Sequence, residues 1–164
     1  MKKYFKYAMA IAMTVTALGI TACGGEEPIE NDGTYYAFYF NNNKVQPLDT
    51  VFYELTREEL DNNLAQPTFV LENLTNGPLS TTQKVEVLEG PASLIADENI
   101  CGGGSCPWNK EPYTLDPGMN PTKSITIDFY PKDNPDLNTA LFKLTVGEAD
   151  NFKHATIIYM RINK

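Results

Sequence analysis

The 164-residue sequence has very little histidine and none of the common catalytic motifs. Its one histidine, His154, stands alone just before the last predicted strand, where a turn or surface residue is more typical than a member of a Ser-His-Asp or Cys-His set. Gly-x-Ser-x-Gly, a phosphate-binding loop and His-Glu-x-x-His are all absent. Acidic residues are plentiful, but no special acidic motif marks a carboxylate pair for glycoside hydrolysis. The sequence therefore predicts no enzyme, no catalytic residues and no cofactor.

Basic residues are also scarce. The chain has 13 Lys and Arg against 21 Asp and Glu, for a formal net charge of −8. Three of the lysines, Lys2, Lys3 and Lys6, lie in the first 22 residues, so the chain from Cys23 onward has a net charge of about −11. Such a balance opposes binding to nucleic acid or to anionic lipid. We therefore expect no nucleic-acid partner.

No apolar run is long enough to span a bilayer. The run from Tyr7 to Ile20 has about fourteen residues, where roughly twenty are needed. It follows a basic start and precedes small residues, which is the order of a cleaved secretory signal. The residues Ile20-Thr21-Ala22-Cys23 resemble a bacterial lipobox, which implies cleavage of residues 1–22 and lipidation of Cys23. A plain secretion signal and a retained membrane helix are the alternatives.

The residues after this cysteine bear on where the chain is delivered. Gly24-Gly25-Glu26-Glu27 resembles the export signal that moves Bacteroidetes lipoproteins to the outer face of the outer membrane. The resemblance implies a protein that is attached to the outer membrane through its lipid and faces the cell exterior. Two acyl chains already give stable anchoring, and a bacterial lipoprotein normally carries three. Alternatively, residues 23–33 are only a flexible acidic tether, because glycine and charge keep a segment from packing.

Cysteine is limited to three residues. If Cys23 carries lipid, Cys101 and Cys106 remain as an even pair in an oxidising compartment, which predicts a disulfide across a short glycine-rich loop. The bridge would mainly fix a local turn. A redox role would favour Cys-x-x-Cys at a helix start, and a zinc site would need further cysteines or histidines. We therefore predict a structural bridge and no metal.

The chain from Cys23 to Lys164 has the size of one ordinary domain and the pattern of an all-β protein. Strands are expected where apolar or β-branched residues alternate with polar ones. The predicted strands are Thr34–Asn41, Asp49–Leu55, Thr68–Leu74, Gln83–Glu89, Tyr113–Asp116, Ser124–Tyr130, Ala140–Val146 and Ala155–Ile162. The last three favour antiparallel pairing. Residues 34–164 are thus expected to form one antiparallel β-sandwich of immunoglobulin type, with about seven or eight strands.

Local signals place turns and one helix between these strands. Asn41-Asn42-Asn43 predicts a turn, because asparagine tolerates left-handed backbone, and the Asn76-Gly77 pair predicts a tight turn. Thr56 and Glu59 form a capping box that starts one short connecting helix.

A family resemblance supports this fold. It rests on Glu72-Asn73-Leu74-Thr75-Asn76-Gly77, on Asn99-Ile100-Cys101 through Cys106, on Leu115-Asp116-Pro117-Gly118, and on the Ile-Thr-Ile-Asp-Phe and final Ile-Ile-Tyr strands. In this order they resemble the small Ig-like domains of Bacteroidetes surface lipoproteins. The family shares an architecture without a common activity, so the resemblance implies fold and location more than function.

Candidate binding residues lie in the segment from Gly90 to Gly118, which is poor in regular structure. Trp108, Asn109 and Tyr113 are candidates for stacking on a sugar or peptide, because loops on a rigid scaffold often carry binding. A lone tryptophan that covers a disulfide is the structural alternative. The aromatic residues from Tyr35 to Phe40 are either core or a binding platform, and alternation favours core.

Three short motifs suggest modification or metal binding. Asp49-Thr50-Val51 resembles the acceptor at which Bacteroidetes O-glycosylate exported proteins, which makes Thr50 a candidate. Asn73-Leu74-Thr75 fits an N-glycosylation acceptor, although in a bacterium the match is expected to be accidental. The oxygen donors of residues 133–138 suit either Ca²⁺ or an ordinary hairpin turn, and the turn is preferred because the features of an EF-hand are missing.

Two functions remain compatible with the sequence. One is a surface-tethered binding or accessory module that engages a glycan, a host protein or a partner in an envelope complex. The other is a purely structural spacer, or an envelope or fimbrial assembly subunit without a small-molecule site.

Overall fold

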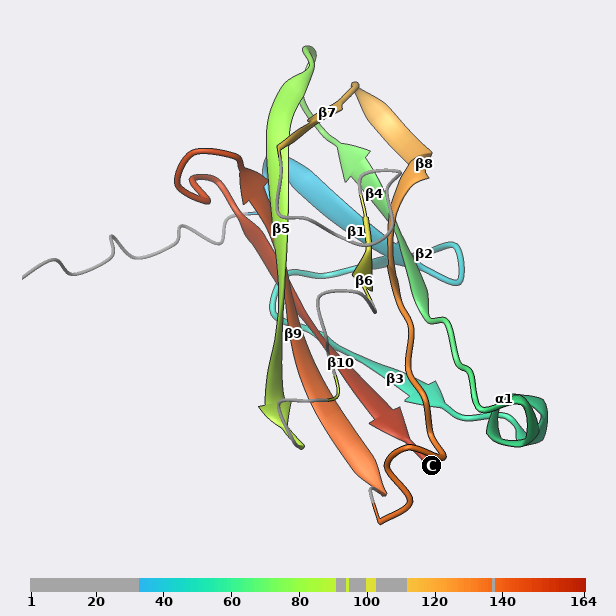
Figure 1. Cartoon of the computed structure of the whole chain (residues 1–164). Helices are drawn as coiled ribbons and strands as arrows, with labels where there is room; N and C mark the ends of the chain where they lie inside the picture. Colours follow the sequence, from blue (N-terminus) through green and yellow to red (C-terminus); the bar gives the residue numbers. More distant parts are fainter. Residues whose placement is uncertain (1–32, 91–93, 95–99, 103–111, 137) are drawn as a thin grey trace, which may run out of the picture.

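The protein folds as a β-sandwich of two five-stranded sheets (Figure 1). The computed structural model describes residues 33–90, 94, 100–102, 112–136 and 138–164. Sheet A contains, in spatial order, β2 (Asn43–Val45), β1 (Tyr36–Phe40), β4 (Thr68–Asn73), β8 (Gly118–Ile127) and β6 (Ile100–Cys101). Sheet B contains β3 (Thr50–Glu54), β10 (Thr156–Asn163), β9 (Thr139–Glu148), β5 (Leu79–Glu89) and β7 (Tyr113–Leu115). The predicted all-β, Ig-like sandwich is confirmed.

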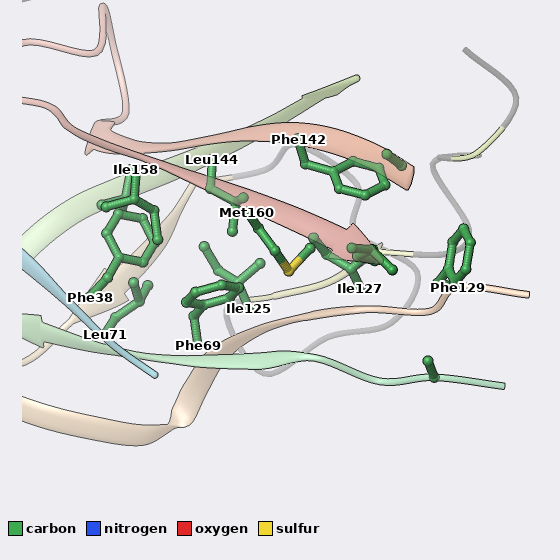
Figure 2. Packing of buried hydrophobic residues seen from close by; sticks show 14 of the residues in the cluster. Phe38, Phe69, Leu71, Ile125, Ile127, Phe129, Phe142, Leu144, Ile158 and Met160 are labelled. Atoms are coloured by element: carbon green, nitrogen blue, oxygen red, sulfur yellow. The ribbon is translucent and has the colours of Figure 1, made fainter. Parts of the chain in front are cut away.

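The core lies between the two sheets, and both sheets contribute large apolar side chains to it. In Figure 2, Phe38, Phe69 and Ile125 of sheet A face Leu144 and Met160 of sheet B. All five side chains have no solvent exposure. Full burial of one such side chain is worth about 1.5–3 kcal/mol, so this layer holds the sheets together.

The predicted alternation on the last three long strands is confirmed. On β9, Phe142, Leu144 and Val146 are fully buried, while Leu141 and Lys143 on the opposite face are only half-buried. The same pattern holds on β8 and β10, because successive residues of a strand point to opposite faces of its sheet.

The strands differ from the prediction in three respects. The described residues form ten strands where about seven or eight were expected, and the short β2 and β6 are the two that were not recognised in the sequence. β9 pairs antiparallel with β10, but β8 lies in the other sheet. β3 pairs parallel with β10, so the sandwich is not purely antiparallel. The two strands of that pair lie about a hundred residues apart in the chain, and no local pattern indicates their pairing.

The segment that contains Asn76-Gly77 is also not a hairpin turn. β4 and β5 lie in different sheets, so this segment crosses from one sheet to the other. Neither Asn76 nor Gly77 has a positive φ angle, which a type I′ turn would require at both positions. Instead, the Asn73 side chain holds the crossing: its amide donates to the carbonyls of Gly77 and Leu115, each at 2.8 Å.

The turn between β1 and β2 and the short helix α1 (Arg57–Asn62) agree with the sequence. Asn41 and Asn42 both have positive φ angles, as expected for a tight hairpin. The capping box at Thr56 and Glu59 is complete, and the left-handed residue Asn63 ends the helix. The Asn63 side chain accepts a 2.6 Å hydrogen bond from the Lys132 backbone, which attaches α1 to the segment after β8.

Candidate functional site

The sequence-predicted site residues are only partly within the described structure. Cys23, Cys106, Trp108 and Asn109 lie outside the described residues, so lipidation, the Cys101–Cys106 bridge and the binding role of Trp108 and Asn109 remain predictions. Among the others, Cys101 ends β6, Tyr113 begins β7 and Thr50 begins β3.

Tyr113 is engaged inside the sandwich. β7 pairs with β5, and the Tyr113 hydroxyl donates a 2.8 Å hydrogen bond to Oε1 of Gln83 on β5. Its ring packs against the core, and Nζ of Lys123 lies 6.0 Å from the ring centroid. The side chain thus links strands of both sheets and has already used its hydroxyl in a protein contact.

Gln83 on β5 of sheet B and Gly102, which directly follows β6 of sheet A, are in contact near Tyr113. Gln83 is 1% exposed, and its Nε2 has no hydrogen-bond partner. Gly102 follows Cys101 and packs directly on the glutamine amide, because a Cβ built on Gly102 would lie 1.4 Å from Nε2. A larger residue at position 102 would displace Gln83 and break the hydrogen bond to Tyr113. Sequence reasoning did not find this pair, since only the fold brings the two residues together.

Tyr113 and Tyr36 both favour their neutral forms. Burial raises the pKa of Tyr113, and the nearby Tyr36 raises it further. Burial likewise raises the pKa of Tyr36, even though a hydrogen bond from Thr81 acts in the opposite direction. Both phenols therefore stay protonated at neutral pH, and neither is suited to act as a general base.

The aromatic residues of β1 belong to the core. Tyr36 and Phe38 are fully buried, and Phe40 packs at 5.0 Å from Phe69 and 6.1 Å from Tyr53, measured between ring centroids. Tyr39 faces the other way and donates a 2.6 Å hydrogen bond to Glu72. Of the two interpretations of this stretch, the core is confirmed.

His154 lies in the turn between β9 and β10, as its position in the sequence predicts. It has a φ angle of 50°, and its ring stacks on Tyr35 with centroids 4.2 Å apart. Among the described residues, no group of three or more His, Cys, Asp or Glu side chains could hold a metal ion. Within the same residues, no helix is long and apolar enough to cross a membrane.

Comparison with known proteins gives only distant structural likenesses. No protein-family model matches the chain, and no curated protein matches it. One similar solved structure is the N-terminal domain of PorA, with 11% identity and a TM-score of 0.45 over 78% of this chain and 96% of that one. Another is the PapD-like domain 7 of human CEP192, with 9% identity and a TM-score of 0.42 over 96% of this chain and 97% of that one. Likenesses this distant give no information about function.

The two candidate glycosylation sites differ in accessibility. Thr50 is exposed at the start of an edge strand, where a transferase could reach it. Asn73 is 2% exposed and uses both amide hydrogens inside the fold, so the Asn73-Leu74-Thr75 motif cannot accept a sugar in the folded state. Modification of Thr50 remains a prediction.

Proposed function

We propose that this protein is a non-catalytic module that a lipid on Cys23 holds at the outer membrane, facing the cell exterior. The observation that carries the proposal is the lipobox-like Ile20-Thr21-Ala22-Cys23, followed by an acidic stretch that leads directly into β1. The eleven residues from Cys23 to Gly33 span at most about 40 Å when extended. On such a tether the sandwich stays close to the membrane surface.

A binding role rests on the segment between Cys101 and Tyr113, where a short bridge would brace a loop that contains the only tryptophan. The ligand classes that suit an aromatic loop are glycans and protein partners. A purely structural or assembly role is the second candidate. The burial of the β1 aromatics supports it, because that stretch is thereby removed as a binding platform.

The lipid anchor is tested by metabolic labelling with a fatty-acid analogue. We expect the wild-type chain to be labelled and Cys23→Ser to lose the label. Cys101→Ser is the matched control, because it removes another cysteine and should keep the label. A Cys23→Ser chain that is labelled as strongly as wild type would refute the anchor.

The glycan-binding role is tested by tryptophan fluorescence, because Trp108 is the only tryptophan. A glycan that binds at this loop should shift the emission of the wild-type protein. Trp108→Phe has no tryptophan emission, so its binding is measured by calorimetry, and its affinity for that glycan should fall by about tenfold or more, since aromatic anchors dominate such contacts. If a broad panel of glycans produces no shift in wild type, the glycan version of the proposal is wrong and the structural role is favoured.

A further inference from the structure

β3 is an edge strand with little of the usual protection, namely the charge of Glu54 at its end. It lies at one end of sheet B and, within the described part of the chain, pairs only with β10. The other three sheet edges are β2, β6 and β7, which have only two or three residues each. β3 has five residues, Thr-Val-Phe-Tyr-Glu, with no lysine, proline or bulge. Natural sheets commonly use those features to block edge-to-edge pairing, and β3 has none of them.

The hydrogen bonds to β10 show which backbone groups of β3 remain free. Tyr159 N–H donates to the Asp49 carbonyl at 2.9 Å, and Leu55 N–H donates to the Asn163 carbonyl at 3.0 Å. In a parallel pair, a residue directs its N–H and C=O to the same side, and the next residue directs them to the opposite side. Because Asp49 and Leu55 direct their backbone groups to β10, Val51 and Tyr53 do so too, and the residues between them direct theirs away from β10.

Three residues of β3 consequently present their backbone groups outward: Thr50, Phe52 and Glu54. Their side chains are all exposed on the outer face of sheet B, and Phe52 is 63% exposed. The intervening Val51 and Tyr53 pack against the core. Among the residues that the structure describes, the edge thus combines three unpaired donor and acceptor pairs with a large exposed aromatic ring.

We propose that β3 pairs antiparallel with β3 of a second copy of this chain, about a two-fold axis at Phe52. In this register Phe52 lies opposite Phe52 of the second copy, and Thr50 lies opposite Glu54 of the second copy. All outward backbone groups then find partners, because every facing pair has both N–H and C=O directed across the axis. A shift of the axis toward either end leaves part of the strand unpaired.

The proposed register avoids a contact between like charges. It places Glu54 against a threonine instead of against the glutamate of the second copy. Cross-strand aromatic pairs such as Phe52 with Phe52 contribute roughly 0.2–1 kcal/mol in sheets. A two-fold arrangement also lets the same patch serve on both subunits, as in most homodimers.

Five residues make a small interface, below the roughly 1,200 Å² typical of stable complexes. The dimer is therefore weak in dilute solution. Confinement to a membrane surface raises the effective concentration of the chains and favours pairing. The inference goes beyond the proposed function, since a tethered module could act as a monomer.

Cysteine cross-linking in cells that produce the full-length chain tests the register. Facing residues of a hydrogen-bonded antiparallel pair have Cα atoms about 5.5 Å apart, within the range of a disulfide. Phe52→Cys should therefore give a disulfide-linked dimer on a non-reducing gel after mild oxidation. Thr50→Cys alone should not, because the two copies of that residue would lie roughly 14 Å apart. Co-production of Thr50→Cys and Glu54→Cys chains should restore the dimer.

Leu88→Cys is the matched control, because Leu88 is 50% exposed but lies on β5. We expect about tenfold more dimer from Phe52→Cys than from this control or from wild type. Adding Phe52→Lys to the Thr50→Cys and Glu54→Cys chains should abolish their dimer, because it places like charges opposite each other. Equal cross-linking at Phe52, Thr50 and Leu88, only monomer at Phe52, or a product with a different protein would each overturn the proposal.

Discussion

Asn73 is the residue on which the crossing between the two sheets depends. Its side-chain amide donates to the Gly77 and Leu115 carbonyls, and its oxygen accepts a 2.8 Å hydrogen bond from Thr75 N–H. The side chain is 2% exposed, so water cannot replace these partners. In the sequence, Asn73 looks like the acceptor of an N-glycosylation motif, and only the fold identifies it as a buried hydrogen-bonding group.

We predict that Asn73→Ala lowers the free energy of unfolding by about 2–4 kcal/mol, because the Leu115 carbonyl loses the donor that Asn73 supplies and the Thr75 N–H loses its acceptor. Asn76→Ala is the matched control, because Asn76 lies in the same segment but is exposed, and a change within about 0.5 kcal/mol is expected. Chemical denaturation of both variants measures the difference. Equal effects would show that the crossing does not depend on Asn73.

Glu59 links stability to pH. Burial raises its pKa, but hydrogen bonds from Tyr53 and from the Thr56 backbone and side chain outweigh burial and leave the pKa below its usual value of 4.5. A carboxyl group whose pKa is lower in the folded state stabilises the fold above its unfolded pKa. That contribution is lost as the pH falls through the folded value.

We therefore predict that Glu59→Gln is destabilising at pH 7 by about 0.5–1 kcal/mol, because glutamine keeps the capping contacts but loses the added strength that the charge gives them. The difference from wild type should shrink as the pH falls below 4.5, the usual value for this carboxyl group. Urea denaturation across the pH series measures it, with Glu58→Gln in the same helical turn as control. A destabilisation that is constant with pH would contradict the role given to the charge.

At the scale of the elements, side-chain alternation made the strands predictable. Apolar residues at every second position identified β9, β10 and the second half of β8 together with their buried faces, whereas the first half of β8, residues 118–123, has no such alternation and was not predicted as strand. Which strands pair with each other was harder to predict, because backbone hydrogen bonds between distant segments produce no periodic pattern of side chains in either segment. The β3–β10 pair and the Gln83–Gly102 contact are examples, and both depend on which strands the fold brings together.

The alternation itself is testable on β9. Leu144→Ala should lower the free energy of unfolding by about 2–5 kcal/mol, because it opens a cavity between the sheets. Leu141→Ala removes the same atoms from the opposite, half-exposed face of the strand and should cost clearly less. Thermal or chemical unfolding distinguishes them. A larger loss of stability from Leu141→Ala than from Leu144→Ala would mean that the buried face of β9 is the opposite of the one described.

At the scale of the whole molecule, the start of β1 and α1 lie toward opposite ends of the sandwich (Figure 1). β1 begins beside the start of β10, where the Thr156 hydroxyl donates to the Tyr36 carbonyl at 2.8 Å. Leu55, just before α1, bonds to Asn163 at the far end of β10. A single chain anchored through Cys23 would therefore direct α1 away from the membrane, whereas in the β3-paired dimer the two copies run in opposite directions and lie with their strands along the membrane.

This orientation predicts which residues an external reagent reaches. In intact cells, Glu58→Cys on α1 should react with a membrane-impermeant maleimide, whereas Leu144→Cys in the core should not. Reaction of Glu58→Cys only after the outer membrane is permeabilised would mean that the module faces the periplasm.

The central claim is that a lipid on Cys23 carries this sandwich. Intact-mass spectrometry of the chain purified from membranes tests it most directly. We predict a mature chain that begins at Cys23 and carries a diacylglycerol group and an amide-linked acyl chain. A chain that retains residues 1–22, or one with an unmodified Cys23 or a start at a later residue, would contradict the account.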